Sequence, residues 1–349
     1  MVVIIGLRTQ PWNNLTRTLE YLCSKEERTW KSRKFNQMRL DEVSCTQRNH
    51  VVFWLRKVAV SMNFGADTFA LSVDLLDRFL ATLKVRPKFL ECVAVGCLYI
   101  AAKIKEEDDM IPITPEFVID CNSSCSANEL LRMERLILEK FEWYADYVTC
   151  VDFMQIYFAL LLQVVWEENF TNEHMIEKYK ELEIKLSSCL QYHRLASFKP
   201  RVLALALISI ELEQQQQQTN IDWLACISYL QRLAKVESES LLQCRELVVR
   251  VLVYKVVRLE SSDLAFISRA AAVINDYNLL NTLLMKSNVV SGGDNICDRR
   301  PTYADVVSGR VQTSTSPIIS CATQLQNEDQ KIITTQSCTV QTNLYIKTH

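Results

Sequence analysis

Residues 89–109 read FLECVAVGCLYIAAKIKEEDD, a run that is mostly apolar until a lysine interrupts it at position 103. Apolar side chains fall on every side of a 3.6-residue repeat, which is the pattern of a helix surrounded by other helices. Pro87 stands just before the run, where a proline at the start of a helix loses no intrahelical hydrogen bond. The run therefore predicts the central helix of an all-helical domain, with Lys103 as its unexpected charge.

Amphipathic helices are predicted on both sides of this run. Residues 46–62 and 67–83 each place apolar side chains on one helical face. Further on, Ser126 and Glu129 form a capping box that begins another helix. Together with a short helix from Thr114, this makes five helices in about one hundred residues, an ordinary length for one domain. We expect the buried face of the first helix to consist of Val51, Trp54, Leu55 and Val58.

The same unit recurs later in the chain. RPKFL at 86–90 is echoed by KPRVL at 199–203, and the apolar positions of 130–137 are matched at nearly the same offset by those of 241–248. Two agreeing offsets favour a duplicated five-helix domain. We therefore predict an all-α fold with the following parts: an N-terminal arm with a short helix (1–45), a first five-helix domain (46–146), a second, diverged one (147–257) and a mostly disordered tail (258–349).

Composition limits the classes of function. The formal net charge of −2 offers no large basic field, so direct binding of nucleic acid is not expected. An odd number of cysteines, 13, in a long chain without a signal peptide indicates reduced thiols, and no apolar run is long enough to span a membrane. Cys121 and Cys125 lack a second ligand pair, so no metal or cofactor is expected. No catalytic motif is recognisable, and we predict that the chain is not an enzyme.

Four blocks of this sequence together resemble the cyclin family, in particular its G-type and I-type members. The blocks are QRNHVVFWL at 47–55, LLDRFL at 75–80, LYIAAK at 98–103 and LLRMERLIL at 130–138. The resemblance is clear in the first repeat and fainter in the second. It implies tandem cyclin boxes and a regulatory subunit that binds a cyclin-dependent protein kinase, acts in cell-cycle or growth-related phosphorylation, and is found in the nucleus and cytoplasm.

In this resemblance, Lys103 and Glu134 correspond to the residues that hold the kinase. Helical spacing places apolar neighbours beside each charge, and the predicted kinase-binding set is Lys103, Glu134, Ile100, Ile104, Leu138 and Trp143. The alternative is structural: Lys103 would complement the end of its helix dipole and Glu134 would be solvated. Gln216 and Arg245 stand at the equivalent places of the second repeat, which suggests that the fold does not need this pair and favours the functional interpretation.

Two further sets of residues follow from the resemblance. Arg48 and Asp77 resemble the charge pair that joins the first two helices of a cyclin box, a structural role. The positions of the family's substrate-docking groove are occupied by Gln47, His50, Val51, Trp54, Lys57 and Glu91. Because two of these are polar replacements and Lys57 replaces an acidic residue, we expect basic substrate motifs to dock poorly unless Glu91 compensates.

A second function remains open for the whole chain. The G-type cyclins that it resembles are also associated with regulatory subunits of protein phosphatase 2A, so the chain could be a kinase-independent adaptor. Lys103 and Glu134 would then have no contact with a kinase. A transcription-type cyclin fold on DNA is disfavoured by the net charge of −2.

Overall fold

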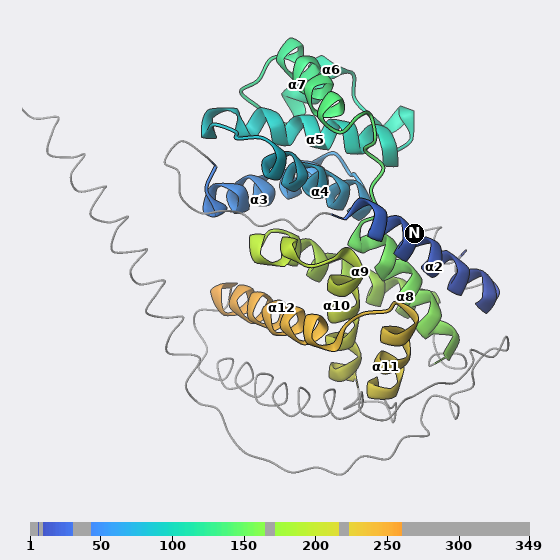
Figure 1. Ribbon diagram of the computed structural model, residues 1–349. Coiled ribbons are helices and arrows are strands. Elements are labelled where there is room, and N and C mark those ends of the chain that lie inside the picture. The colour runs from blue at the N-terminus through green and yellow to red at the C-terminus, as the bar shows by residue number, and fades with distance from the viewer. Residues whose placement is uncertain (1–5, 7–9, 31–42, 165–171, 216–222, 260–349) are drawn as a thin grey trace, which may run out of the picture.

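The computed structural model describes residues 6, 10–30, 43–164, 172–215 and 223–259, and this part of the chain is helical without strands (Figure 1). The first group of helices comprises α3 (Cys45–Ser61), α4 (Ala66–Thr82), α5 (Leu90–Lys105), α6 (Thr114–Asp120) and α7 (Ala127–Lys140). The second comprises α8 (Cys150–Val164), α9 (Asn172–Leu190), α10 (Pro200–Gln215), α11 (Trp223–Leu233) and α12 (Ser238–Leu259). α2 (Trp12–Thr29) precedes both. The all-helical class is confirmed, while the predicted tail lies outside the described residues from 260 onward.

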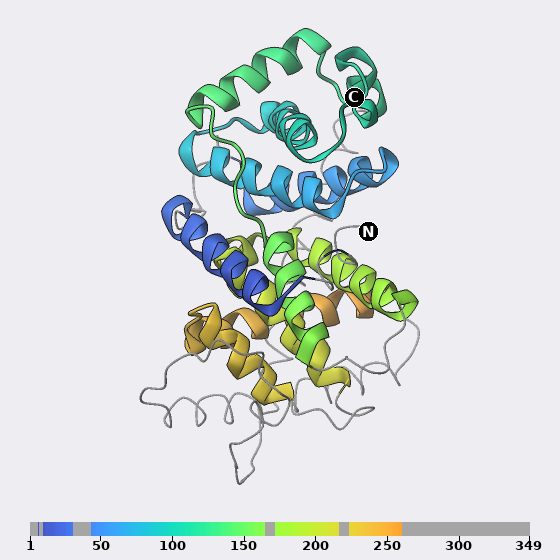
Figure 2. The ribbon, with the colours of Figure 1, turned by 90° about the vertical axis from the view of Figure 1, so that its right-hand side faces the viewer.

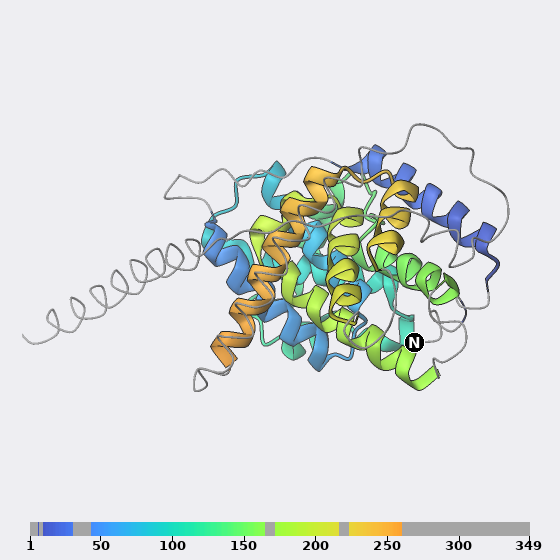
Figure 3. The same ribbon diagram turned by 90° about the horizontal axis from the view of Figure 1, so that it is seen from below.

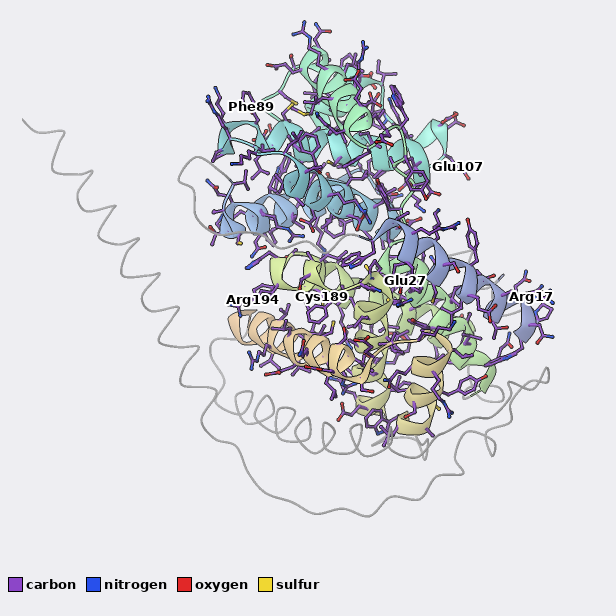
Figure 4. The ribbon with its side chains drawn as sticks, in the orientation of Figure 1. Arg17, Glu27, Phe89, Glu107, Cys189 and Arg194 are labelled. Carbon is purple, nitrogen blue, oxygen red and sulfur yellow. The ribbon has the colours of Figure 1, made fainter. Side chains whose placement is uncertain are left out.

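Each group of five helices has its own hydrophobic core. The first core is built from residues 52–147, and α5 lies at its centre with nearly all of its apolar side chains buried. The second core is built from α8–α12 and receives the apolar face of α2. Figure 1 shows the first group stacked on the second, and Figure 3 shows α12 crossing the second group on the side away from the first. Burial of α5 on all sides confirms the helix predicted from residues 89–109, preceded by a 3-10 turn, η1 (Pro87–Phe89).

The buried face of α3 differs from the predicted one. Arg48, Val52, Leu55, Val58 and Ala59 are buried, whereas Val51 and Trp54 are only half-buried. The reason is a polar contact at the start of the helix, where Arg48 points inward to bind Asp77 of α4. This contact turns Val51 and Trp54, the residues predicted from hydrophobicity, partly toward solvent. An apolar pattern could not predict that an arginine would define the inner face.

Close packing of α5 against α7 requires a glycine. A Cβ atom built on Gly96 would lie 3.0 Å from Ile137 Cδ1 and 3.2 Å from Met133 Cγ, both on α7. These separations are shorter than ordinary van der Waals contact, so a larger residue here would force the side chains of Ile137 and Met133 to shift by a few tenths of an ångström. Gly96 therefore sets the distance between the two helices that carry Lys103 and Glu134.

The N-terminal helix α2 is longer than the short helix expected, and it is an integral part of the second group. Trp12, Leu15, Leu19 and Cys23 enter the second core, and Figure 2 shows α2 lying obliquely along that group. Its C-terminal end also reaches the first group, because Arg78 Nη1 donates to the carbonyl oxygen of Thr29 at 2.8 Å. α2 thus contacts both groups of helices.

A buried glutamate anchors α2 to α10. The backbone N–H of Arg201 donates to Glu26 Oε1 at 2.9 Å, and Arg201 Nε lies 3.2 Å from Glu26 Oε2. Glu27 on the same helix accepts hydrogen bonds from Lys199 Nζ at 2.7 Å and from Arg201. Burial raises the pKa of Glu26 to about 7, although the hydrogen bond and the charge of Arg201 act in the opposite direction.

This raised pKa predicts a pH-dependent stability. The folded state holds a proton on Glu26 that the unfolded state releases near pH 4.5, so its stabilising contribution is complete at low pH and is lost as the pH rises to about 7. Replacing Glu26 with Gln should remove this dependence. The difference in unfolding free energy, variant minus wild type, should therefore increase by about 2–3 kcal/mol when the pH is raised from 5 to 8. Urea unfolding of both proteins across this range measures the difference; a difference that does not change with pH would contradict the assignment.

Candidate functional site

The two charges singled out from the sequence meet on the surface of the first group. Lys103, near the C-terminal end of α5, places its Nζ 2.7 Å from Oε1 of Glu134 on α7. The same ammonium group lies 4.1 Å from the centre of the Tyr99 ring, a cation–π contact. The two residues thus form an ion pair with each other in the free chain. The Lys103 side chain is 43% exposed and that of Glu134 is 13% exposed, so Lys103 remains accessible to a partner.

Large apolar side chains lie around this pair and are open to solvent. Ile104 and Trp143 are exposed, Trp143 at 68%, and Leu138 is half-buried. Ile100, by contrast, is only 3% exposed and belongs to the first core, so its side chain is not part of this exposed surface, and its role in binding stays a prediction. Its position one turn before Lys103 places it beneath the surface, because α5 is enclosed by other helices up to that turn.

One residue of this surface, Leu131, was not identified from the sequence, and neither was a further exposed aromatic residue, Tyr144, which follows α7. Leu131 and Tyr144 are both exposed. Leu131 precedes Glu134 by three residues and Leu138 by seven, so helical spacing could have identified it. Tyr144 follows α7 and packs edge-on against Tyr147 at 5.2 Å, a contact that no local pattern predicts. We call Ile104, Leu131, Glu134, Leu138, Trp143 and Lys103 the α5–α7 face.

The backbone that presents Trp143 is strained. Glu142 and Trp143 have φ angles of 52° and 63°, in the left-handed region that favours glycine. The N–H of Trp143 donates to the carbonyl oxygen of Leu138 at 2.8 Å, which closes the end of α7 in the manner of a Schellman motif. The backbone of Trp143 is therefore held at the end of α7 by hydrogen bonding, while its indole is open to solvent.

A glycine at position 142 should stabilise the protein. Glu142→Gly removes the clash of a Cβ atom in the left-handed region, and we expect a gain of about 0.5–1 kcal/mol in the free energy of unfolding, after allowing for the flexibility of glycine in the unfolded chain. The matched control is Glu139→Gly, three residues earlier inside α7, which should cost about 1 kcal/mol. Thermal unfolding of both variants tests the sign, and a loss of stability in Glu142→Gly would refute the strain.

The second group contains a counterpart of the Lys103–Glu134 pair with its polarity reversed. Glu213 on α10 and Arg245 on α12 lie 2.7 Å apart, and Arg245 is fully buried, also donating to Ser209. The inference from Gln216 and Arg245 that the fold does not need such a pair loses its support, because Arg245 pairs with an acid that lies one turn before Gln216. Among the described residues, an ion pair between these two helices is common to both groups, but the base is 43% exposed in the first pair and fully buried in the second.

Arg48 and Asp77 form a buried ion pair between α3 and α4. Arg48 Nε and Nη2 donate to the two carboxylate oxygens of Asp77 at 2.8 and 2.7 Å, and the side chains are 1% and 2% exposed. Arg48 Nη1 also donates to the carbonyl oxygen of Leu190 at 2.9 Å, at the end of α9. This arginine therefore connects α3 and α4 of the first group to α9 of the second group, and its contacts are structural.

A small cavity lies beside this ion pair. It has a volume of about 40 Å³ and is lined by residues of both groups, including Arg48, Asp74 and Asp77. Such a volume accommodates a water molecule but not a substrate, since ligand pockets usually measure about 300–1,000 Å³. Among the described residues, no cluster of three or more His, Cys, Asp or Glu side chains is placed to hold a metal ion.

Two of the six predicted groove residues are engaged in local structure. The Gln47 side chain accepts a hydrogen bond from the backbone N–H of Ser44 and completes the capping box of α3. Glu91 accepts hydrogen bonds from Ser123 and from the backbone N–H of Ser124 at 2.9 and 2.7 Å, so its charge is used by the loop before α7. His50 and Lys57 are exposed, and Val51 and Trp54 are half-buried. Docking of substrates at these positions stays a prediction.

The arrangement of helices matches that of a solved structure. A viral cyclin from herpesvirus saimiri matches with a TM-score of 0.55 and 20% sequence identity, covering 67% of this chain and 97% of the viral chain. At this identity the likeness establishes the fold alone. The helices described above thus define a protein with the cyclin fold. Within the described residues, no helix has the length and hydrophobicity needed to cross a bilayer.

Sequence comparisons match part of the chain to a known family. Residues 17–146 match the family described as "Cyclin, N-terminal domain". Cyclin-G1 from Bos taurus is 34% identical over 190 residues, 54% of this chain, and Cyclin-I2 from Homo sapiens is 33% identical over 237 residues, 67% of this chain. The chain is similar to the G-type and I-type members of the cyclin family, which confirms the resemblance found in the sequence. Both matches span 62% of the relatives' own length.

Proposed function

We propose that this chain is a regulatory subunit that binds a cyclin-dependent protein kinase through the α5–α7 face. The observation that carries the proposal is the exposed Lys103–Glu134 pair at the centre of a surface of large apolar side chains. Apolar patches that surround a small number of charges are typical of protein interfaces, where the charges set specificity and the apolar anchors supply most of the affinity. The first group, which contains this face, is the part matched by the cyclin N-terminal domain.

Binding would act on the kinase through a conformational equilibrium. A kinase is active when a glutamate of its regulatory helix pairs with its active-site lysine. A subunit that binds this arrangement more tightly than the inactive one shifts the population toward it, without performing chemistry itself. Trp143, fixed by the end of α7, and Leu131 would pack against the regulatory helix, while Lys103 and Glu134 would contact backbone groups at its start. We infer that the chain is not itself an enzyme.

The second candidate function is a kinase-independent adaptor for a protein phosphatase 2A regulatory subunit. The observation that favours it is the buried Glu213–Arg245 pair, because a counterpart in the second group shows that such a pair can serve helix packing alone. In that case the charges of Lys103 and Glu134 would not determine which proteins bind.

Affinity capture followed by mass spectrometry separates the two functions. The full chain and a variant with both Lys103→Glu and Glu134→Lys are used as baits, with circular dichroism to check that the variant is folded. We expect a cyclin-dependent kinase with the wild type and its loss from the folded variant. A phosphatase subunit captured by both baits, without a kinase, would refute the kinase proposal and support the adaptor.

A further inference from the structure

The seam between α3 and α9 carries large apolar side chains that are open to solvent. Phe53 and Val60 lie on the outer side of α3, and Ile184 lies on α9. Arg56 Nη1 is 3.5 Å from the hydroxyl oxygen of Ser188 on α9, which places the two helices side by side here. Because α3 belongs to the first group and α9 to the second, this seam is separate from the α5–α7 face.

Among the described residues, half-buried Arg56 has no carboxylate partner, in contrast to the buried arginines of this chain. Arg48, Arg201 and Arg245 each lie within an ion pair. Arg56 is half-buried, yet in the described part of the chain it has only the long contact with the Ser188 hydroxyl. Burial lowers the pKa of its guanidinium, and no acidic group offsets that effect. A half-buried cation without a counter-charge can gain substantially from an anionic ligand.

The α3 side of the seam is also basic. α3 contains no acidic residue along its 17 residues. Lys57 Nζ lies 4.5 Å from the centre of the Phe53 ring, and Lys180 precedes Ile184 by one turn of α9. The acid beside Ile184 is Glu183, which is partly buried, and its pKa is raised by burial and by the charge of Asp67. On the α3 side of the seam the charges beside the apolar side chains are therefore positive, whereas α9 carries both signs, with Glu177 exposed one turn before Lys180.

We propose that the α3–α9 seam docks an acidic linear segment of a partner protein. An Asp or Glu carboxylate of that segment would pair with Arg56, and large aliphatic or aromatic side chains would cover Phe53, Val60 and Ile184. The guanidinium can hold a carboxylate through two parallel hydrogen bonds, which also fixes the register of the segment. A basic segment would be repelled by Arg56 and Lys57, so the α3 side of the seam selects the class of ligand.

The seam would add a second binding function to the proposed kinase subunit. A partner on α3 and α9 leaves the α5–α7 face free, so one chain can hold both proteins together. The two proposals can fail separately: reversal of Lys103 and Glu134 should not change binding at the seam, and changes at Val60 should not change binding at the α5–α7 face.

Selection from a phage library of short random peptides on the full-length protein tests the proposal. We expect the enriched peptides to combine Asp or Glu with at least one large apolar residue, and their affinity, measured by fluorescence polarisation, to fall with added salt. Val60→Asp and Arg56→Gln should each weaken binding by at least about tenfold. Val60 is 70% exposed, so its substitution should leave folding intact even if that of Arg56 does not.

The matched control is Ile119→Asp on α6, which makes the same kind of change at a residue that is 73% exposed and lies outside the seam. It should bind the selected peptides as the wild type does. The proposal is overturned if no peptides are enriched, if the enriched peptides are neutral or basic, or if Val60→Asp binds them with unchanged affinity.

Discussion

Replacing Asp77 with alanine should lower the free energy of unfolding by about 3–5 kcal/mol. The change leaves the guanidinium of Arg48 buried, at 1% exposure, without the two hydrogen bonds that it makes to the carboxylate. Its remaining contact with the carbonyl oxygen of Leu190 does not neutralise the charge. Because Arg48 connects α3, α4 and the end of α9, we also expect the two groups of helices to unfold less cooperatively in the variant.

Two further variants isolate the cause of this loss. Arg135→Ala removes an exposed ion pair with Glu139 on α7, in which Arg135 is 76% exposed, and should change stability by less than about 0.5 kcal/mol. A double variant, Arg48→Met with Asp77→Leu, replaces the buried pair by apolar groups and should recover most of the loss. Urea unfolding measures all three. If Asp77→Ala costs no more than Arg135→Ala, the pair does not have the structural role assigned to it.

Reversing both charges of the Lys103–Glu134 pair should abolish most kinase binding while leaving the fold intact. In the Lys103→Glu, Glu134→Lys variant the two side chains can still pair with each other across α5 and α7. The Glu213–Arg245 pair shows that an acid on the central helix and a base on the last one suit this packing. A partner arranged for the original polarity would meet reversed charges, which we expect to cost at least about 3 kcal/mol, or more than about one hundredfold in affinity.

The single variants show whether the pair also stabilises the fold. Lys103→Glu places two carboxylates together, and Glu134→Lys places two ammonium groups together, so each should lose about 0.5–1 kcal/mol of stability at this partly exposed site. The double variant should regain that stability but not the affinity for the kinase. This separation of stability from binding would distinguish a contact with a partner from a purely structural pair.

Local patterns predicted much of the first group. The capping box of Ser126 and Glu129, the proline at the start of η1 and the hydrophobicity of α5 each depend on neighbours in sequence, and the structure contains all three. The meeting of Lys103 and Glu134 followed from the resemblance to cyclins. The burial of Ile100 was missed because an apolar residue beside Lys103 fits the core and the surface equally well in a helical pattern.

Contacts between distant segments could not be predicted in this way. The amphipathic pattern of α2 shows that it has an apolar face but not that this face enters the second core, where Glu26 meets Arg201. The Glu213–Arg245 pair was missed because alignment of the repeats pointed to Gln216, while the structure uses a residue one turn earlier. The lack of a counter-charge at Arg56 is visible only when the neighbours from α9 are known.

The most direct test is a calorimetric titration of purified cyclin-dependent kinases into the wild-type chain and into the Lys103→Glu, Glu134→Lys variant. The temperature midpoint of unfolding is measured for both proteins as a control for folding. Our account predicts that at least one kinase binds the wild type, that the variant binds it more than about one hundredfold more weakly, and that the two midpoints agree. Equal affinity for the two proteins, or no binding of any kinase to the folded wild type, would contradict a kinase-binding role for the α5–α7 face.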